Sequence, residues 1–501
     1  MTQPAGSSPT EPGAPAASGL PDVEVADARA RATTEATVPA GWTRRFVVGL
    51  ALIGLVGLGV RVAYILVAKS DGDACGQKVC GDAYYYSLQA EVIAQGDGFE
   101  RPFTGGEAAD HPPLTALVAT PAAMLAGENT MAQRLTMALV GTGAVVMIGL
   151  LGRAVAGDRA GLIAAGIAAL YPNMWMNDGV AMSESLTALG MATCLWLTYR
   201  LIRSPSVITT AWLGAAVGLS VLARAELALY LPLVVVPVVL WRLDIDLRAR
   251  LVRLVVAGAA TLAVLAPWTI YNATRFERPV LVSTNDGLTL IGANCDGVYS
   301  GSRIGLWDAF CAEDVPAGGD QSRASAAYRS AAVDYIGDHL DRVPAVVAAR
   351  VGRVWSVFQP VQMADYSVAE GRERALSLIG TFVYYPLVVA AVAGAVVLIR
   401  RRTPLWPLAA TFVMVTITAM VLYGLTRFRV PAEVAIVVLA AVLVDHLLPG
   451  GEMVSRRISP ESDGGGSGCW VCPCHAARGW LEANPADRDG RIGRWPCPCC
   501  R

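Results

Sequence analysis

The 501-residue chain is 54% hydrophobic and only 16% charged, with a mean hydropathy of +0.47. Ordinary soluble domains carry roughly 25% charged residues, so lipid is the expected solvent for most of this sequence. The 40 basic and 41 acidic residues nearly cancel, which excludes the strongly basic surface that nucleic-acid binding requires.

Residues 1–42 are rich in Ala, Pro, Gly, Ser, Thr and acidic residues and contain almost no large apolar side chains. Such a segment cannot bury enough surface to offset the entropy of ordering, so we expect a disordered cytoplasmic tail. It lacks the basic region and short apolar run of a cleavable signal peptide. The first apolar stretch follows Arg44 and Arg45 and is long enough to cross a bilayer of roughly 30 Å, which predicts a retained membrane helix.

Comparable apolar segments recur along the chain and predict an all-α polytopic membrane protein. The expected spans number about ten and are 46–68, 132–152, 159–175, 184–202, 206–222, 226–241, 251–271, 374–399, 405–424 and 430–448. Short cytoplasmic loops are rich in arginine. The loops after the even-numbered spans meet this rule through Arg153, Arg159, Arg200, Arg203, Arg242, Arg248, Arg250, Arg400, Arg401 and Arg402.

This orientation predicts a multi-pass protein of the plasma membrane with both termini in the cytoplasm. The membrane domain is expected over 43–450, with two large outer loops at about 69–131 and 272–373. The second loop is long enough to hold helices, for example around 324–341 and 344–358. Paired inverted repeats, which are typical of symmetric transporters, are not evident. Large loops on one face instead predict chemistry at the extracytoplasmic side.

Asp82 lies in the first outer loop, close to the predicted membrane boundary. A carboxylate there is well placed to deprotonate a hydroxyl group, provided that its surroundings adjust its pKa. The alternative is that Asp82 caps a helix beginning at Ala83, which is a favoured position for Asp. His111 precedes two prolines later in the same loop; it is a candidate contact for a phosphate or an acceptor, or else an ordinary loop histidine.

A second group of polar residues lies where the fourth and fifth predicted spans meet outer turns. Asn173 and Glu184 flank one turn, and Arg224 and Glu226 lie in another. Ionisable groups near a membrane are costly and tend to be functional or paired. Glu184 is also suited to the start of a helix, and Arg224 and Glu226 are suited to pair with each other.

Arg427 and Arg429 lie between the last two predicted spans, on the outer side. This placement opposes the positive-inside tendency, so both guanidinium groups need an anionic partner. A lipid-linked phosphate suits their planar fork. The alternative is anchoring to anionic lipid headgroups.

These residues occur in an order that resembles a known family. The run Gly81-Asp82-Ala-Tyr-Tyr-Tyr86 is followed by Ala90-x-x-Ile-Ala-Gln-Gly-x-Gly-Phe99, then by His111-Pro-Pro-Leu and Gln133-Arg-Leu. Ser183-Glu-Ser-Leu186, Ala266-Pro-Trp268 and Arg427-Phe-Arg-Val-Pro431 follow. Over about 45–448 the chain resembles GT-C membrane glycosyltransferases, most closely glycosyltransferase family 39, which includes protein O-mannosyltransferases and aminoarabinose transferases.

The resemblance implies transfer of a sugar from a polyprenyl-phosphate donor to a glycan, lipid or protein acceptor at the outer face, with inversion. It implies Asp82 as the base and Glu184 as a second acidic site residue. His111, Arg224, Arg427 and Arg429 are the candidates for donor-phosphate binding, and Tyr85, Tyr86 and Asn173 are expected to line the site. No metal is required, because these side chains can stabilise the leaving phosphate; a divalent ion at the phosphate is the alternative. The family's first loop often has two adjacent acidic residues, whereas Gly81 precedes Asp82 here.

Two other functions remain open at this point. A transporter or flippase of a lipid-linked sugar would bind the same ligand without reacting it, and a scaffold of a cell-wall assembly complex would need no essential carboxylate.

The 11 cysteines fall into three groups. Cys75 with Cys80, and Cys295 with Cys311, share outer loops and are candidate disulfides of an oxidising compartment, with free thiols as the alternative. Cys194 lies within a predicted span and is expected to act as a small apolar residue. The others lie in the tail 451–501, at spacings that do not match paired zinc knuckles. We expect this tail to be disordered, cytoplasmic and outside the catalytic unit.

Overall fold

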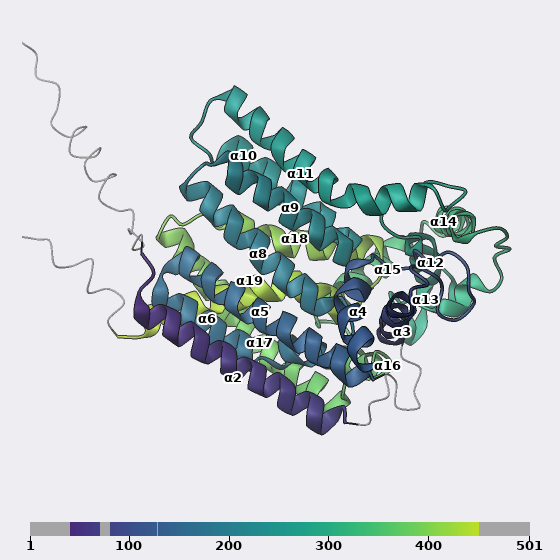
Figure 1. Ribbon diagram of the computed structural model, residues 1–501, viewed down its shortest axis with the longest axis horizontal. Helices are drawn as coiled ribbons and strands as arrows, with labels where there is room; N and C mark the ends of the chain where they lie inside the picture. The colour runs from purple at the N-terminus through teal and green to yellow at the C-terminus, as the bar shows by residue number, and fades with distance from the viewer. Residues whose placement is uncertain (1–40, 71–80, 128, 450–501) are drawn as a thin grey trace, which may run out of the picture. The chain divides into compact units, whose positions relative to one another are not determined.

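The computed structural model describes residues 41–70, 81–127 and 129–449 (Figure 1). The regular structure of these residues is helical, apart from one isolated bridge between Glu100 and Glu107, and this confirms the predicted all-α class. The predicted terminal tails and the candidate pair Cys75 and Cys80 lie outside the described residues, except for the last few positions of the N-terminal segment.

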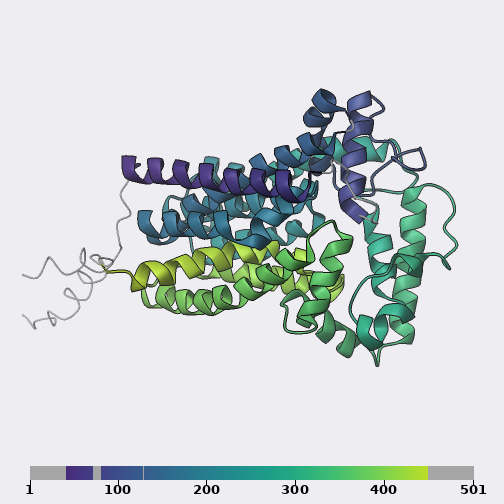
Figure 2. The ribbon, with the colours of Figure 1, turned by 90° about the horizontal axis from the view of Figure 1, so that it is seen from below.

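Each expected apolar segment is largely helical, and the helices of these segments lie side by side in one bundle (Figures 1 and 2). They are α2 (Arg44–Ala68), α5 (Thr130–Ala156), α6 (Asp158–Leu170), α8 (Glu184–Arg203), α9 (Val207–Ala223), α10 (Val236–Trp241), α11 (Leu247–Ala273), α17 (Arg374–Arg400), α18 (Trp406–Val421) and α19 (Val430–Leu447).

Five of the described helices are long and apolar enough to cross a membrane: α2, α5, α11, α17 and the helical stretch Thr426–Leu447 that contains α19. Others are short for this purpose, since a span needs about 20 residues, whereas α6 has 13 and α9 has 17. The segment predicted at 226–241 is divided into η2 (Ala225–Leu229), η3 (Leu231–Val235) and α10. Pro232 and Pro237 interrupt the regular hydrogen-bond ladder there. The count of about ten spans therefore stays a prediction.

Helix α19 lies in the centre of the bundle and, between Glu433 near its start and Asp445 near its end, is apolar on every side, as expected for a buried helix. It is close to α17, where a Cβ added at Gly394 would lie 1.9 Å from the Leu439 carbonyl oxygen. The chain enters α19 directly from η6 (Thr426–Arg429). The arginines of η6 are thus carried by a rigid core element.

The two large polar segments gather at one end of the bundle (Figure 2). The first contributes α3 (Gly81–Gln95) and α4 (Leu114–Ala126). The second contributes α12 (Asn285–Ala293), α13 (Asp296–Tyr299), η4 (Gly301–Arg303), η5 (Ala309–Ala312), α14 (Gln321–Asp338), α15 (Val343–Val354) and α16 (Pro360–Ala369). Helices α14 and α15 correspond to those expected in this loop. Cys295 and Cys311 form a disulfide here, and Cys194 is buried in α8.

A short turn between α6 and α8 also reaches this end. It comprises α7 (Pro172–Trp175) and η1 (Met176–Gly179). Asp178 of η1 forms an ion pair of 2.5 Å with Arg61 of α2, and both side chains are only 1% exposed. Ser185 donates a hydrogen bond to the same carboxylate. This buried cluster fixes the turn against α2.

Candidate active site

Asp82 lies in the first turn of α3 and contacts two side chains from distant segments. Its Oδ2 is 2.6 Å from Nη1 of Arg427 in η6, and its Oδ1 is 3.6 Å from Nε2 of His111. The Asp82 side chain is 27% exposed. It lies inside α3, which the structure describes from Gly81, so it does not stand before a helix that begins at Ala83.

The charges around Asp82 govern its protonation. Burial by itself raises the pKa of this carboxyl, but Arg427 and His111 outweigh burial and hold the pKa well below its usual range. The group is therefore ionised at neutral pH, which is the state that a general base needs. The same contacts also make it a weak base for as long as they persist.

His111 lies between two tyrosine rings of α3. Its ring centroid is 4.8 Å from that of Tyr85 and 5.0 Å from that of Tyr86. The Tyr85 hydroxyl donates to Asp110, with an oxygen-to-oxygen distance of 3.1 Å. Burial, reinforced by Asp110, raises the pKa of Tyr85, and burial reinforced by Asp82 raises that of Tyr86. Both phenols therefore stay neutral and hold the imidazole beside Asp82.

Arg427 is also the first member of a row of alternating cationic and anionic side chains. Its Nη1 also lies 3.1 Å from Oε1 of Glu370, and the other carboxylate oxygen of Glu370 pairs with Nη1 of Arg372. Nη2 of Arg372 is 3.7 Å from Oε1 of Glu184, which is 3.3 Å from Nη1 of Arg224. The row therefore links residues from four separate parts of the chain.

The far end of this row is closed by Glu226, whose Oε1 lies 2.6 Å from Nε of Arg224. The expected pairing of these two residues is therefore present. Glu184 has no exposed surface, so its carboxylate is enclosed by Arg224 and Arg372. The Arg224 guanidinium also lies over the Phe428 ring, 4.8 Å from the centroid.

Glu370 and Arg372 were missed by the sequence reasoning. They lie in the turn between α16 and α17, within the run Glu370-Gly-Arg-Glu-Arg374. A dense charge cluster directly before an apolar span is the signal that could have identified them, because charges at a membrane boundary need partners.

Arg429 is separated from Asp82 and belongs to a second network. Its Nε donates to Glu433 at 2.9 Å and its Nη1 donates to the Ser356 hydroxyl at 2.8 Å. The guanidinium carbon lies 3.6 Å from the Tyr384 ring centroid. Asn173 donates to the same Glu433 carboxylate, at 3.2 Å. The two arginines of η6 therefore point to different partners.

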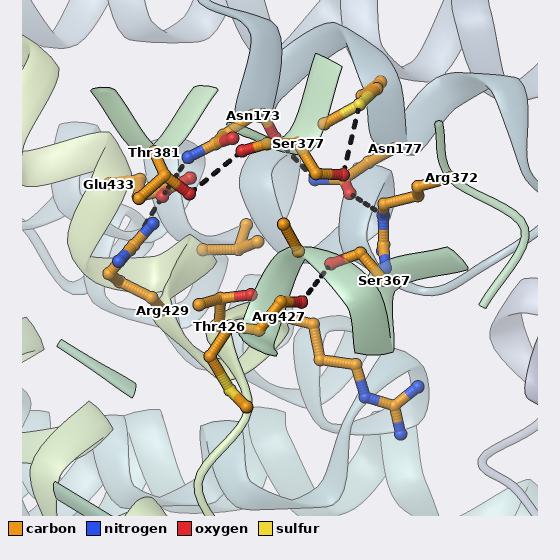
Figure 3. Close-up of a pocket in the computed structure, with 14 residues that line it drawn as sticks. Asn173, Asn177, Ser367, Arg372, Ser377, Thr381, Thr426, Arg427, Arg429 and Glu433 are labelled. Carbon is orange, nitrogen blue, oxygen red and sulfur yellow. Dashed lines mark hydrogen bonds and ion pairs between the residues drawn. The ribbon is translucent and has the colours of Figure 1, made fainter. Parts of the chain in front are cut away.

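A pocket lies between these two networks. It encloses about 450 Å³ of empty space, a figure that includes the part open to solvent. Figure 3 shows Arg429 and Glu433 on one side of it and Arg372 with Asn177 on the other; the Arg427 guanidinium points away from Arg429. The lining residues are Asn173, Met176, Asn177, Met363, Ala364, Ser367, Arg372, Ser377, Thr381, Thr426, Arg427, Arg429, Val430 and Glu433.

Among the described residues, no group of three or more His, Cys, Asp or Glu side chains is placed to hold a metal ion. The carboxylates at this end of the bundle are matched mainly with arginines.

Several known proteins resemble the chain. The solved structures include the oligosaccharyltransferase AglB of Archaeoglobus fulgidus in complex with an inhibitory peptide and a dolichol-phosphate, with 16% identity over 80% of this chain and a TM-score of 0.46. The chain spans about half of that protein, matching 50% of its length. ArnT of Cupriavidus metallidurans bound to undecaprenyl phosphate is 16% identical over 80% of this chain and 78% of its own, with a TM-score of 0.38. No curated protein matches the chain.

The sequence profile of the family described as dolichyl-phosphate-mannose-protein mannosyltransferase matches residues 110–271. This segment contains His111, Glu184 and Arg224, while Asp82 precedes it and Arg427 follows it. The predicted resemblance is thereby confirmed: residues 110–271 carry the sequence pattern of the dolichyl-phosphate-mannose-protein mannosyltransferases.

Proposed function

We propose that the chain is an integral membrane glycosyltransferase of GT-C architecture, which moves a sugar from a polyprenyl-phosphate donor to a glycan, lipid or protein acceptor. The observation that carries the proposal is the contact of Asp82 with Arg427 and His111. One carboxylate able to accept a proton lies beside a guanidinium and an imidazole able to hold a phosphate, at the end of the bundle where both polar segments gather. The matched family is itself named for a polyprenyl-phosphate sugar donor.

In the proposed reaction an Asp82 carboxylate oxygen takes the proton of the acceptor hydroxyl. The acceptor oxygen forms a bond to the anomeric carbon while the bond from that carbon to the phosphate oxygen breaks, so the configuration inverts. The polyprenyl phosphate leaves with the electron pair. Because it is already an anion, it needs cationic stabilisation and no strong acid. Arg427 supplies the positive charge, and His111 can donate a ring N–H to the phosphate.

The remaining candidate residues take supporting roles in this proposal. Glu184 is enclosed between arginines, so it acts as a positioning residue for them and not as a catalytic group. Arg224 and Arg429 are each held by a carboxylate and orient the walls of the site. Tyr85 and Tyr86 hold His111, and Asn173 lines the pocket. A divalent metal is not part of the mechanism.

The membrane arrangement belongs to the same proposal. We assign the catalytic domain to 43–450, with about ten spans, both termini in the cytoplasm and the site on the extracytoplasmic face of the plasma membrane. The arginine-rich loops on the opposite side support this orientation. The tails at 1–42 and 451–501 are placed outside the catalytic unit.

The proposal is tested with membranes containing the chain and a panel of labelled polyprenyl-phosphate hexoses and pentoses. Transfer moves the label from the lipid donor to another molecule, in a reaction absent from membranes that lack the chain. A flippase would instead change the leaflet of the labelled lipid and leave the lipid intact. Translocation without transfer, for every donor in the panel, would overturn the proposed enzyme.

A further inference from the structure

The turn between α16 and α17 places an internal anion between two arginines of the site. Glu370 uses its two carboxylate oxygens for two different guanidinium groups, Oε1 for Arg427 and Oε2 for Arg372. The side chains of Arg427, Arg372 and Glu370 are 13%, 5% and 17% exposed. Two nearly buried cations thus share Glu370, while Arg427 also pairs with Asp82 and Arg372 faces Glu184 at 3.7 Å.

Both arginines retain unused hydrogen-bonding capacity. Nε of Arg427 and Nη2 of Arg372 are buried, and neither has a hydrogen-bond acceptor in the part of the chain that the structure describes. Nη2 of Arg372 faces Glu184 only at 3.7 Å, beyond hydrogen-bond distance. A buried donor without an acceptor is costly, so this pair of arginines is suited to an anion with more oxygens than a carboxylate has.

The geometry of the two guanidinium groups indicates which class of anion they would bind. Guanidinium groups recognise carboxylates and phosphates through the same paired contacts. A phosphate offers two or three charged oxygens, against two on Glu370. Arg372 and Arg427 also both line the 450 Å³ pocket (Figure 3), whose neutral polar side chains include Asn173, Ser367 and Thr381. Amides and hydroxyls of this kind are hydrogen-bonding partners for sugar hydroxyls.

The backbone beside Glu370 is held by local hydrogen bonds: the N–H groups of Glu370 and Arg372 donate to the Ser367 carbonyl oxygen, and Lys69 donates to that of Gly371. Gly371 has a φ of +83°, a conformation that glycine adopts without steric cost. Glu370 follows the end of α16, whereas Glu373 is fixed to the end of α2 by an ion pair of 2.5 Å with Lys69. Release of the two arginines therefore requires only a rotation of the Glu370 side chain, while the backbone of the turn and the start of α17 stay in place.

We propose that Arg372 and Arg427 form the phosphate subsite of this enzyme, and that the Glu370 carboxylate occupies this subsite until the phosphate of the lipid-linked donor displaces it. The inference rests on the proposed function and adds Arg372 as a phosphate ligand and Glu370 as an internal competitor. Displacement also draws Arg427 toward the phosphate and away from Asp82. Donor binding thereby strengthens Asp82 as a base.

The test is equilibrium binding of polyprenyl phosphate to the purified full-length protein, without any transfer step. Arg372→Gln removes charged contacts to the phosphate and is expected to weaken binding about tenfold or more. Glu370→Gln removes the competitor while keeping the side-chain shape, and is expected to tighten binding about tenfold. The double variant should bind weakly. Arg374→Gln, on an exposed pair with Asp365 in the next turn of chain, should bind as the wild type does.

Inorganic phosphate, added as a competitor, separates recognition of the phosphate from recognition of the lipid. The same directions of change are expected for both ligands, and thermal unfolding confirms that each variant is folded. Weaker or unchanged binding of polyprenyl phosphate by folded Glu370→Gln would overturn the inference, as would unchanged binding by Arg372→Gln. Variants that change the binding of polyprenyl phosphate but not that of inorganic phosphate would also contradict the inference. None of these results depends on transfer, so they are distinct from a failure of the proposed function.

Discussion

Replacing Arg427 with glutamine tests the electrostatic link between Arg427 and Asp82. The two side chains are 2.6 Å apart, and Arg427 is the foremost charge that holds the pKa of the Asp82 carboxyl below its usual range. A neighbouring opposite charge lowers a carboxyl pKa by about 1–3 units. Loss of Arg427 should therefore raise the pKa of Asp82 by about that amount, because burial then acts with less opposition.

The direction of the pH effect follows from the role of Asp82 as a base. Only the ionised carboxylate accepts a proton, so transfer is lost as the pH falls through its pKa. The wild-type protein keeps the active form to below about pH 4, the usual range for Asp. The Arg427→Gln variant should lose the ionised, active form of Asp82 at a pH about 1–3 units higher than the wild-type protein does.

The assay measures kcat/KM for sugar transfer, from initial rates at low concentrations of labelled polyprenyl-phosphate sugar, across acidic and neutral pH. This quantity reports the pKa of the donor-free enzyme, in which Arg427 contacts Asp82. The position of the acidic limb is compared and not the absolute rate, because Arg427→Gln also weakens the stabilisation of the leaving phosphate. Arg374→Gln removes an exposed arginine near the site and should keep the wild-type limb. An acidic limb that stays in place in Arg427→Gln would refute the electrostatic coupling.

Three further variants probe the supporting structure. Asp178→Asn leaves Arg61 as a buried charge without its counter-ion and should lower the free energy of unfolding by about 3–5 kcal/mol; an unchanged unfolding transition in detergent would contradict this. Cys295→Ser opens the disulfide to Cys311, across 16 residues of sequence, and should cost about 3 kcal/mol, with the same loss on reduction of the wild type. His111→Gln removes the imidazole beside Asp82 and should slow transfer about tenfold. His339→Gln, on α14, serves as the matched control, and equal rates for both variants would argue against a role for His111.

The positions of the helices could be predicted from the apolar runs, because burial in lipid or in the bundle requires long stretches without charge. The boundaries of α2, α5, α11 and α17 follow the expected segments closely. The division of 226–241 was missed, since Pro232 and Pro237 were read as part of one apolar run. A helix such as α19, buried by protein on all sides, looks in sequence like one that faces lipid.

The candidate site was predictable only in part. Asp82, His111 and Arg427 could be named because charges near an apolar span are rare, and the structure brings all three together. Their contacts could not be predicted, since they join segments that are remote in sequence. Glu370 and Arg372 were missed because their short polar turn resembles any charged loop. Arg429, although two residues from Arg427, belongs to another network because η6 turns the two side chains apart.

The most direct test of the central claim is sugar transfer by Asp82→Asn. Asparagine keeps the size of the side chain and removes the carboxylate that accepts the proton, so the transfer rate should fall by about 10²–10⁴-fold. Binding of polyprenyl phosphate should persist, and Asp365→Asn, at an exposed carboxylate, should transfer at the wild-type rate. Wild-type transfer by folded Asp82→Asn would contradict the account.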